Sequence, residues 1–218
     1  MGADGCRVVV LGGSKGGCGR STLARNLLVS AAQEGLRAVG VDLDRQATLL
    51  RWSERRAKAR EKLTEIVPVE AFPAEAVGWP AIIERVAGHQ LAVIDTAPGV
   101  EENMTAMIEL CRRATLVLVP TSPSTDDLES VAPWFRTLAQ SGSRGTFVLN
   151  KANRRTRSYA AARTALLRHG PLAPVEIPAL EDIPAPFASG LAVVDYEKSK
   201  GADAMGDLWL FVRREVGL

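Results

Sequence analysis

Residues 12–22, which read Gly-Gly-Ser-Lys-Gly-Gly-Cys-Gly-Arg-Ser-Thr, have the composition of a phosphate-binding loop. Glycines adopt positive φ and carry no Cβ, so successive backbone N–H groups can turn inward and form a nest for an anion. A helix that begins near Arg20 would add unpaired N–H groups and the positive end of its dipole. The hydroxyl of Ser21 is of the kind that holds Mg²⁺ beside phosphates. The segment therefore predicts a site for a nucleotide phosphate and magnesium.

The residues around this loop have the pattern of a strand followed by a helix. An apolar run, residues 8–11, precedes the loop, and an amphipathic stretch, residues 23–33, follows it. This is the context in which such a loop binds phosphate, and a glycine-rich turn without a ligand is the alternative. The usual pattern is G-x-x-x-x-G-K-[ST]. Here Lys15 comes early in the loop, and Arg20 occupies the place of the usual lysine.

Two acidic motifs follow predicted strands downstream of the loop. Residues 37–41 predict a strand that ends at Asp42 and Asp44, and residues 91–94 predict a buried strand that ends at Asp95. In an open α/β sheet, ligands bind at the carboxyl ends of the strands, so these carboxylates would face the same crevice as the loop. Solvated turn acids, and an acid that caps the following helix, are the alternatives.

These motifs together resemble the ParA/MinD family of ATPases, whose deviant Walker A motif is K-G-G-x-G-K-[ST]. Residues 15–19 and residues 21–22 match that motif, whereas Arg20 does not. Residues 42–46 fit the family's D-x-D-x-Q pattern, and residues 95–98 are similar to its Asp-Thr-x-Pro Walker B segment. The resemblance extends over most of the chain and is specific in these three motifs.

The resemblance implies that the loop binds ATP with Mg²⁺. In the family, the early lysine, here Lys15, reaches across a dimer to the partner's nucleotide. Asp44 would position the attacking water or the metal's water shell, and residues 96–99 would sense the γ-phosphate. The implied nucleotide-binding residues are Gly13, Ser14, Lys15, Gly16, Gly17, Cys18, Gly19, Arg20, Ser21 and Thr22. The implied metal ligands are Ser21, Asp44 and Asp95, and the implied catalytic residues are Lys15, Asp44 and Arg20.

The order of predicted elements indicates the fold class. The 218 residues are long enough for one α/β domain with a sizeable core, and we expect a single domain over residues 1–218. Strands and helices alternate, which predicts a mostly parallel twisted sheet with helices on both faces, as in P-loop NTPases. The predicted strands are residues 8–11, 37–41, 66–71, 91–95, 114–119, 146–150 and 175–178. The predicted helices are residues 21–34, 49–63, 79–87, 128–140 and 204–215, with one more inside 151–170.

Composition excludes several other classes of protein. No apolar run approaches the roughly 20 residues needed to span a bilayer. The amino end has no secretory signal pattern, so we expect a cytoplasmic protein. The three cysteines at positions 6, 18 and 111 lack metal-ligand spacing, which indicates reduced thiols and argues against an iron–sulfur protein. The net charge is only +2, so any nucleic-acid binding must come from local patches.

The most basic part of the chain is residues 151–170, which contain no acid. This stretch resembles the arginine-rich segment of ParA-type proteins. Arginines on one face of a helix can neutralise phosphates without reading bases. A solvated helix, or arginines paired with acids elsewhere, is the alternative. The candidate DNA-binding residues are Arg154, Arg155, Arg157 and Arg163. A second basic run, residues 51–62, is typical of a solvated helix face.

The resemblance is closest to short ParA proteins that lack an N-terminal helix-turn-helix domain. It implies a nucleoid-associated switch that dimerises with ATP, binds DNA non-specifically and positions a plasmid, chromosome or large cargo. A ParB-like partner or cargo adaptor would stimulate hydrolysis. Because arginine is longer than lysine and planar, we expect Arg20 to slow hydrolysis while ATP binding survives.

Two other functions fit parts of the sequence. A MinD-like membrane-cycling ATPase needs a terminal amphipathic helix, and residues 208–218 have some of that character but suit a packed final helix. We therefore expect no membrane partner. An ATP-dependent small-molecule ligase of the same superfamily, such as dethiobiotin synthetase, is the second alternative, and the early Lys15 argues against it.

Overall fold

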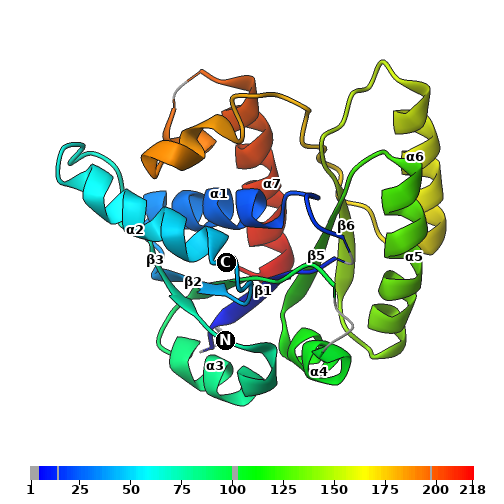
Figure 1. Ribbon diagram of the computed structural model, residues 1–218, viewed down its shortest axis with the longest axis horizontal. Helices are drawn as coiled ribbons and strands as arrows, with labels where there is room; N and C mark the ends of the chain where they lie inside the picture. Colours follow the sequence, from blue (N-terminus) through cyan, green and yellow to red (C-terminus); the bar gives the residue numbers. More distant parts are fainter. Residues whose placement is uncertain (1–4, 14, 100–102, 197) are drawn as a thin grey trace.

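The computed structural model describes residues 5–13, 15–99, 103–196 and 198–218 (Figure 1). Six strands form one sheet in the order β3-β2-β4-β1-β5-β6, and every neighbouring pair is parallel. The predicted fold class is therefore confirmed. The strands are β1 (Arg7–Leu11), β2 (Ala38–Asp42), β3 (Glu70–Pro73), β4 (Leu91–Asp95), β5 (Leu116–Thr121) and β6 (Gly145–Leu149).

Helices cover both faces of the sheet (Figure 1). Alternate residues of a strand point to opposite faces, so Val9 and Leu11 pack against one layer of helices and Val8 and Val10 against the other. The first layer is α1 (Arg20–Gln33), α2 (Thr48–Arg60) and α7 (Lys200–Val216). The second layer is α3 (Trp79–Val86), α4 (Met104–Arg113), α5 (Thr125–Gln140) and α6 (Arg157–His169). Short 3-10 helices are η1 (Ala76–Gly78), η3 (Ala185–Ser189) and η4 (Val193–Asp195).

Several predicted boundaries differ from the structure. The prediction of a strand at residues 175–178 is wrong, because only an isolated bridge joins Ala152 to Pro178 there. Proline has no N–H to donate to a ladder, which limits regular pairing. The strand predicted at residues 66–71 begins later, at Glu70. The helix α4 was not predicted.

Capping explains two helix starts. The Ser124 side chain accepts a hydrogen bond from the N–H of Asp127, so α5 begins at Thr125 rather than at residue 128. The Ser199 side chain accepts from the N–H groups of Gly201 and Ala202, and α7 therefore begins before residue 204. Among the described residues, no helix combines the length and apolar character required to cross a membrane.

A buried ion pair joins α2 to the segment before α7. Arg56 has no exposed side-chain surface, and its two Nη atoms donate to the Asp195 carboxylate at 2.7 and 2.9 Å. Its Nε donates to the carbonyl of Val67, and Nη1 also donates to the carbonyl of Gly190. The interpretation of residues 51–62 as a solvated face is therefore wrong for Arg56, because a carboxylate far along the chain compensates its charge.

We expect Asp195→Ala to lower the free energy of unfolding by about 3–5 kcal/mol, because it leaves the buried charge of Arg56 uncompensated. Urea unfolding measures the change. Glu109→Ala is the matched control, because Glu109 pairs with Arg112 on the solvent-exposed surface. Such exposed pairs contribute about 0–1 kcal/mol to the free energy of unfolding. Equal losses in the two variants would contradict this assignment.

Candidate phosphate-binding site

The glycine-rich loop lies at the carboxyl end of a central strand. It runs from the end of β1 at Leu11 to the start of α1 at Arg20, so the predicted strand–loop–helix context is confirmed (Figure 1). Gly17 and Gly19 have φ of 77° and 98°, a backbone conformation that favours glycine. A Cβ on Gly19 would also lie 2.2 Å from the side-chain nitrogen of Asn150. The backbone thus needs glycine at both positions.

Arg20 turns its buried guanidinium back onto the loop. Nη1 donates to the carbonyl of Lys15 at 2.6 Å and lies 3.2 Å from the Cys18 sulfur, while Nε donates to the carbonyl of Thr96 at 2.9 Å. The Thr96 hydroxyl in turn donates to the carbonyl of Leu11 at 2.7 Å. Arg20 therefore connects the loop to the segment that follows β4, using donors that would otherwise be available to a phosphate.

The other predicted loop residues divide by exposure. Gly13 and Cys18 are buried, and Gly16 and Gly17 are exposed. Lys15, Gly19, Ser21 and Thr22 are half-buried, and Ser14 lies outside the described residues. In the described part of the chain, no hydrogen bond or ion pair engages the Lys15 ammonium. Burial raises the pKa of the Cys18 thiol, so this cysteine stays protonated at neutral pH.

The acidic motifs meet at the same edge of the sheet. Asp42 and Asp95 are register partners on β2 and β4, so their side chains stand at the same level. The Asp42 carboxylate accepts hydrogen bonds from the N–H groups of Asp44 at 3.0 Å and Leu50 at 2.9 Å, which shapes the loop before α2. Asp44 is half-buried, and its carboxylate accepts from the N–H of Gln46. Asp42 is thus occupied by backbone donors, whereas Asp95 is not.

Asp95 is fully buried, and neither of its carboxylate oxygens has a hydrogen-bond partner within normal geometry. Burial raises its pKa to about 7, the nearby Ser21 hydroxyl and Arg20 guanidinium lower that pKa, and Asp42 and Asp44 raise it. A carboxylate in these surroundings is stabilised by a cation, which is what a divalent metal supplies. The donor set of Asp95 and the Ser21 hydroxyl therefore fits Mg²⁺.

A complete protein cage for a metal is absent from the residues that the structure describes, because no group of three or more His, Cys, Asp or Glu side chains is placed to hold one. Mg²⁺ suits this arrangement, since it usually takes one or two carboxylates together with waters and substrate phosphates. The residues that would hold it are Ser21 and Asp95, with Asp44 at the rim.

Two residues of the site were not predicted. Asn150 is buried just after β6, and its side-chain amide donates to the carbonyl of Cys18 at 2.6 Å. The ammonium of Lys151 donates to the carbonyl of Gly17 at 2.7 Å, from a backbone with φ of 52°. Both follow a buried strand at the ligand-binding edge of the sheet, so the argument used for Asp42 and Asp95 would have found them.

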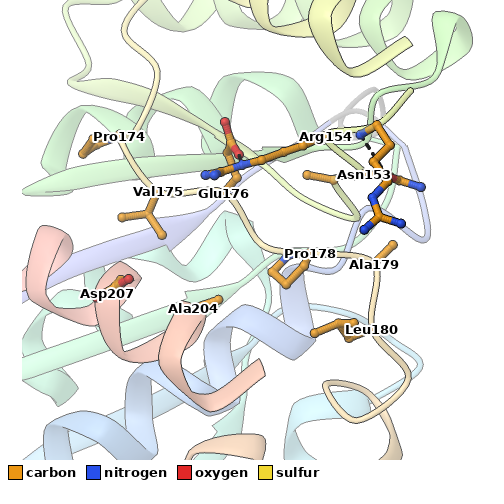
Figure 2. A pocket seen from close by; sticks show the side chains of 12 residues that line it. Asn153, Arg154, Pro174, Val175, Glu176, Pro178, Ala179, Leu180, Ala204 and Asp207 are labelled. Carbon is orange, nitrogen blue, oxygen red and sulfur yellow. Dashed lines mark hydrogen bonds and ion pairs between the residues drawn. The ribbon is translucent and has the colours of Figure 1, made fainter. Parts of the chain in front are cut away.

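A groove of about 610 Å³ has Ala152, the next residue along the chain, in its lining. Figure 2 shows the side chains that line this groove. The turn after β6, the segment around Pro178 and the α7 residues Ala204 and Asp207 line it. Arg154 lies on its wall, where Nε donates to the Glu176 carboxylate at 2.7 Å. The Tyr159 hydroxyl donates to the same carboxylate. Arg154 is therefore paired with an acid. For this arginine, the structure has the ion pair that the sequence analysis gave as the alternative to DNA contact.

The four candidate DNA-binding arginines do not share one helix face. All are exposed, but Arg154 and Arg155 precede α6, which begins at Arg157. Arg157 and Arg163 are six residues apart, which places them about 120° apart around the helix axis. The structure thus gives a basic surface around the start of α6 rather than a single stripe.

Comparison with known proteins agrees with this geometry. The family model described as the CobQ/CobB/MinD/ParA nucleotide binding domain matches residues 9–193. The chain belongs to this family. It is therefore a member of a nucleotide-binding family, and the predicted relation to ParA and MinD is confirmed. A sequence comparison with curated proteins finds no significant match.

Several solved structures share the fold of this chain. MinD of Pyrococcus horikoshii, complexed with Mg-ADP, has a TM-score of 0.75 and 22% identity, covering 97% of this chain and 98% of that one. A protein of Borrelia burgdorferi described as a plasmid partition protein, bound to AMPPNP, has 0.74 and 14%, covering 96% and 99%. Cobyrinic acid a,c-diamide synthase of Mycobacterium smegmatis, with a bound ATP analogue and magnesium, has 0.70 and 18%, covering 98% and 97%.

We expect Asp95→Asn to stabilise the metal-free protein by about 2–4 kcal/mol at pH 8, because it removes a buried charge without a partner. A raised pKa means that the folded state holds the proton more tightly than the unfolded state. The stability of the unmodified protein therefore falls as pH rises from about 4 to 7, and the advantage of the variant disappears toward pH 4. Urea unfolding in EDTA across this range measures it.

Asp42→Asn is the matched control, because its register is the same but its oxygens already accept backbone N–H bonds. We expect this variant to lose stability, since an amide nitrogen would face a backbone donor. An Asp95→Asn protein that is less stable at pH 8 than the unmodified chain would show that Asp95 is compensated by the protein itself.

Proposed function

We propose that this chain is an ATP-dependent switch that dimerises with ATP and positions DNA or another large cargo. The single observation that supports it best is the buried Asp95 carboxylate, without a hydrogen-bond partner, beside the glycine-rich loop. Mg²⁺ at the nucleotide site would compensate the charge of this carboxylate. The early Lys15 is a second support. In the family that the motifs resemble, this lysine reaches the partner's nucleotide across a dimer, and here its ammonium has no partner among the described residues and is free to do so.

The proposed nucleotide complex uses the groups already described. The loop amides from residue 13 to residue 19 and the first turn of α1 would bind the phosphates of ATP. Ser21 and Asp95 would hold Mg²⁺, which when bound neutralises charge on the phosphates. Asp44, half-buried at the rim, would orient the attacking water. The relatives bound to Mg-ADP, AMPPNP or an ATP analogue with magnesium support ATP and Mg²⁺ as the ligands.

The contacts of Arg20 support the part of the proposal that the chain binds ATP but hydrolyses it slowly. Its Nε and Nη1 already donate to the carbonyls of Thr96 and Lys15, so a phosphate has to compete for a side chain that holds two segments together. A lysine has one flexible ammonium and no planar fork. It would therefore lose less free energy than Arg20 on giving up backbone contacts to reach a phosphate. The loop amides and the proposed Mg²⁺ ligands do not depend on this exchange.

We expect the unmodified protein to bind a fluorescent ATP analogue, and Arg20→Lys to raise its rate of ATP hydrolysis roughly tenfold or more, because a freed cation reaches the phosphates. Titration and a phosphate-release assay measure the two quantities. Lys15→Ala is the control: it should keep nucleotide binding and lose ATP-dependent dimerisation in sedimentation. Binding that appears only after Arg20→Lys would overturn the proposal that the loop accepts ATP as it stands.

The cargo of the proposed switch is DNA bound without sequence preference. The support is the exposed basic surface at the start of α6, in a segment without acids. Within it, Arg155 and Arg157 take part in no ion pair of the described chain, whereas Arg154 is paired with Glu176. A ParB-like partner or cargo adaptor would stimulate hydrolysis and release the DNA, in a nucleoid-associated and cytoplasmic protein.

We expect random-sequence DNA to be retarded only with ATP and less so as salt increases, since the contacts are to phosphates. Replacing Arg155 and Arg157 by alanine should weaken binding and reduce the slope of log K against log salt by about 0.9 per lost contact. Arg154→Ala is the matched control with a smaller effect, because Glu176 already engages that side chain. Unchanged binding after all three replacements would place the DNA site elsewhere.

The two alternative functions have less support. For a membrane-cycling ATPase, the final helix would have to be available to lipid, but α7 buries Leu208, Val212 and Val216 in the core. A small-molecule ligase shares the fold, as the cobyrinic acid a,c-diamide synthase does, but such a likeness carries no substrate. The early Lys15 favours the switch.

A further inference from the structure

Two neighbouring carbonyl groups of the glycine-rich loop are held by side chains from a distant part of the chain. The carbonyl of Cys18 accepts a hydrogen bond from the Asn150 amide at 2.6 Å, and the carbonyl of Gly17 accepts one from the Lys151 ammonium at 2.7 Å. Both donors lie in the turn after β6, 132 and 134 residues along the chain from their acceptors. The orientation of this part of the loop is therefore set from outside the loop.

A held carbonyl also fixes the direction of the N–H group that follows it. A peptide unit is planar, and in the trans form its C=O and N–H bonds point in opposite directions. The described chain has no cis peptide bond. The Lys151 contact with Gly17 thus directs the N–H of Cys18, and the Asn150 contact with Cys18 directs the N–H of Gly19. Because glycine allows many backbone conformations, such contacts are needed to select one.

The N–H groups of this segment are available to a ligand. From residue 15 to residue 19, no backbone N–H donates to an oxygen atom of a described residue with normal hydrogen-bond geometry. Backbone N–H groups are strong donors, and a run of them without acceptors forms a site for an anion. The loop thus combines engaged carbonyls with free N–H groups, which is the arrangement that a phosphate requires.

Lys151 makes its contact from a backbone conformation that is unfavourable for lysine. Its φ of 52° lies in the left-handed region, which residues other than glycine rarely adopt. Its N–H donates to the side-chain oxygen of Asn150 at 2.9 Å. The Asn150 amide therefore holds the loop through its nitrogen and the backbone of Lys151 through its oxygen. Contacts that maintain such strain are common at functional sites.

We propose that Asn150 and Lys151 are positioning residues that direct the N–H groups of Cys18 and Gly19 toward a bound phosphate. Neither side chain acts on the nucleotide itself, since each acts through a loop carbonyl. A loop that is ordered before binding loses less conformational entropy when the phosphate arrives, and its affinity is higher for that reason. This inference rests on the proposed function, because it requires that the loop binds ATP.

A direct contact with the phosphates is the other role that the Lys151 ammonium could have. The ammonium is exposed and already donates to the Gly17 carbonyl. The two roles differ in the protein without nucleotide. Positioning orders the loop before any ligand is present, whereas a direct contact affects only the complex.

Nucleotide affinity is the first test. Lys151→Met keeps the aliphatic part of the side chain and removes the donor, and we expect the Kd for a fluorescent ATP analogue to rise roughly threefold to tenfold. Lys151→Arg keeps a charged donor and should recover most of the affinity. Lys198→Met is the matched control, because Lys198 is also exposed and has a φ of 61°, and its Kd should not change. Lys151 is the residue to replace because it is exposed, whereas Asn150 is buried.

Backbone dynamics of the protein without nucleotide separate positioning from direct contact. Relaxation of ¹⁵N nuclei gives an order parameter for each amide, which is about 0.85 in rigid backbone and below about 0.6 in flexible backbone. We expect the values for Cys18 and Gly19 to fall toward 0.6 in Lys151→Met and to stay unchanged in Lys198→Met. A lower affinity with unchanged order parameters would assign Lys151 to a direct contact and contradict the positioning role.

The same measurements distinguish a failure of this inference from a failure of the proposed function. If the unmodified protein binds ATP and the Lys151→Met and Lys198→Met variants bind it equally well, the proposed function stands and the positioning role is wrong. If the unmodified protein binds no ATP, the proposed function is wrong, and so is a positioning role toward ATP, whatever the order parameters are.

Discussion

Parallel register at the centre of the sheet places three chain segments at one level. Asp95 at the end of β4 is the register partner of Leu11 on β1 and of Asp42 on β2. The glycine-rich loop follows Leu11, the loop before α2 follows Asp42, and the segment that Arg20 contacts follows Asp95. Since a strand cannot shift by one residue without turning its core side chains outward, the hydrophobic core fixes this level. The arrangement of the site at the edge of the sheet therefore follows from the packing of the strands' side chains in the hydrophobic core.

The substitution of arginine for the usual lysine keeps the charge of the loop but changes what that charge contacts. A lysine ammonium has one centre, whereas the Arg20 guanidinium donates in two directions, from Nε to Thr96 and from Nη1 to Lys15. The side chain thereby belongs to the protein's own hydrogen-bond network before any ligand arrives. Where the family motif has a lysine, this chain has an arginine that connects the loop to the segment after β4.

Local patterns were sufficient for the central part of the fold. Buried apolar runs that end in Asp42, Asp95 or the glycine-rich loop were recognisable because a parallel strand covered on both faces is continuously apolar. The prediction of a strand at residues 175–178 was wrong, because apolar content alone does not show whether a ladder of backbone hydrogen bonds can form beside prolines. The pairing of Arg56 with Asp195 connects positions 139 residues apart, and composition near either residue gives no sign of it.

The contacts that Asn150 and Lys151 make have a mechanical consequence. They hold the carbonyls of Cys18 and Gly17 from the turn that leads into α6. A displacement of those carbonyls must either break both bonds or carry the turn with it. Because α6 begins six residues after Lys151, a moving turn would tilt the amino end of that helix, where Arg157 lies. The glycine-rich loop and the surface that bears the arginines are thus joined by two side chains and one short segment, so that a movement of one would be passed to the other.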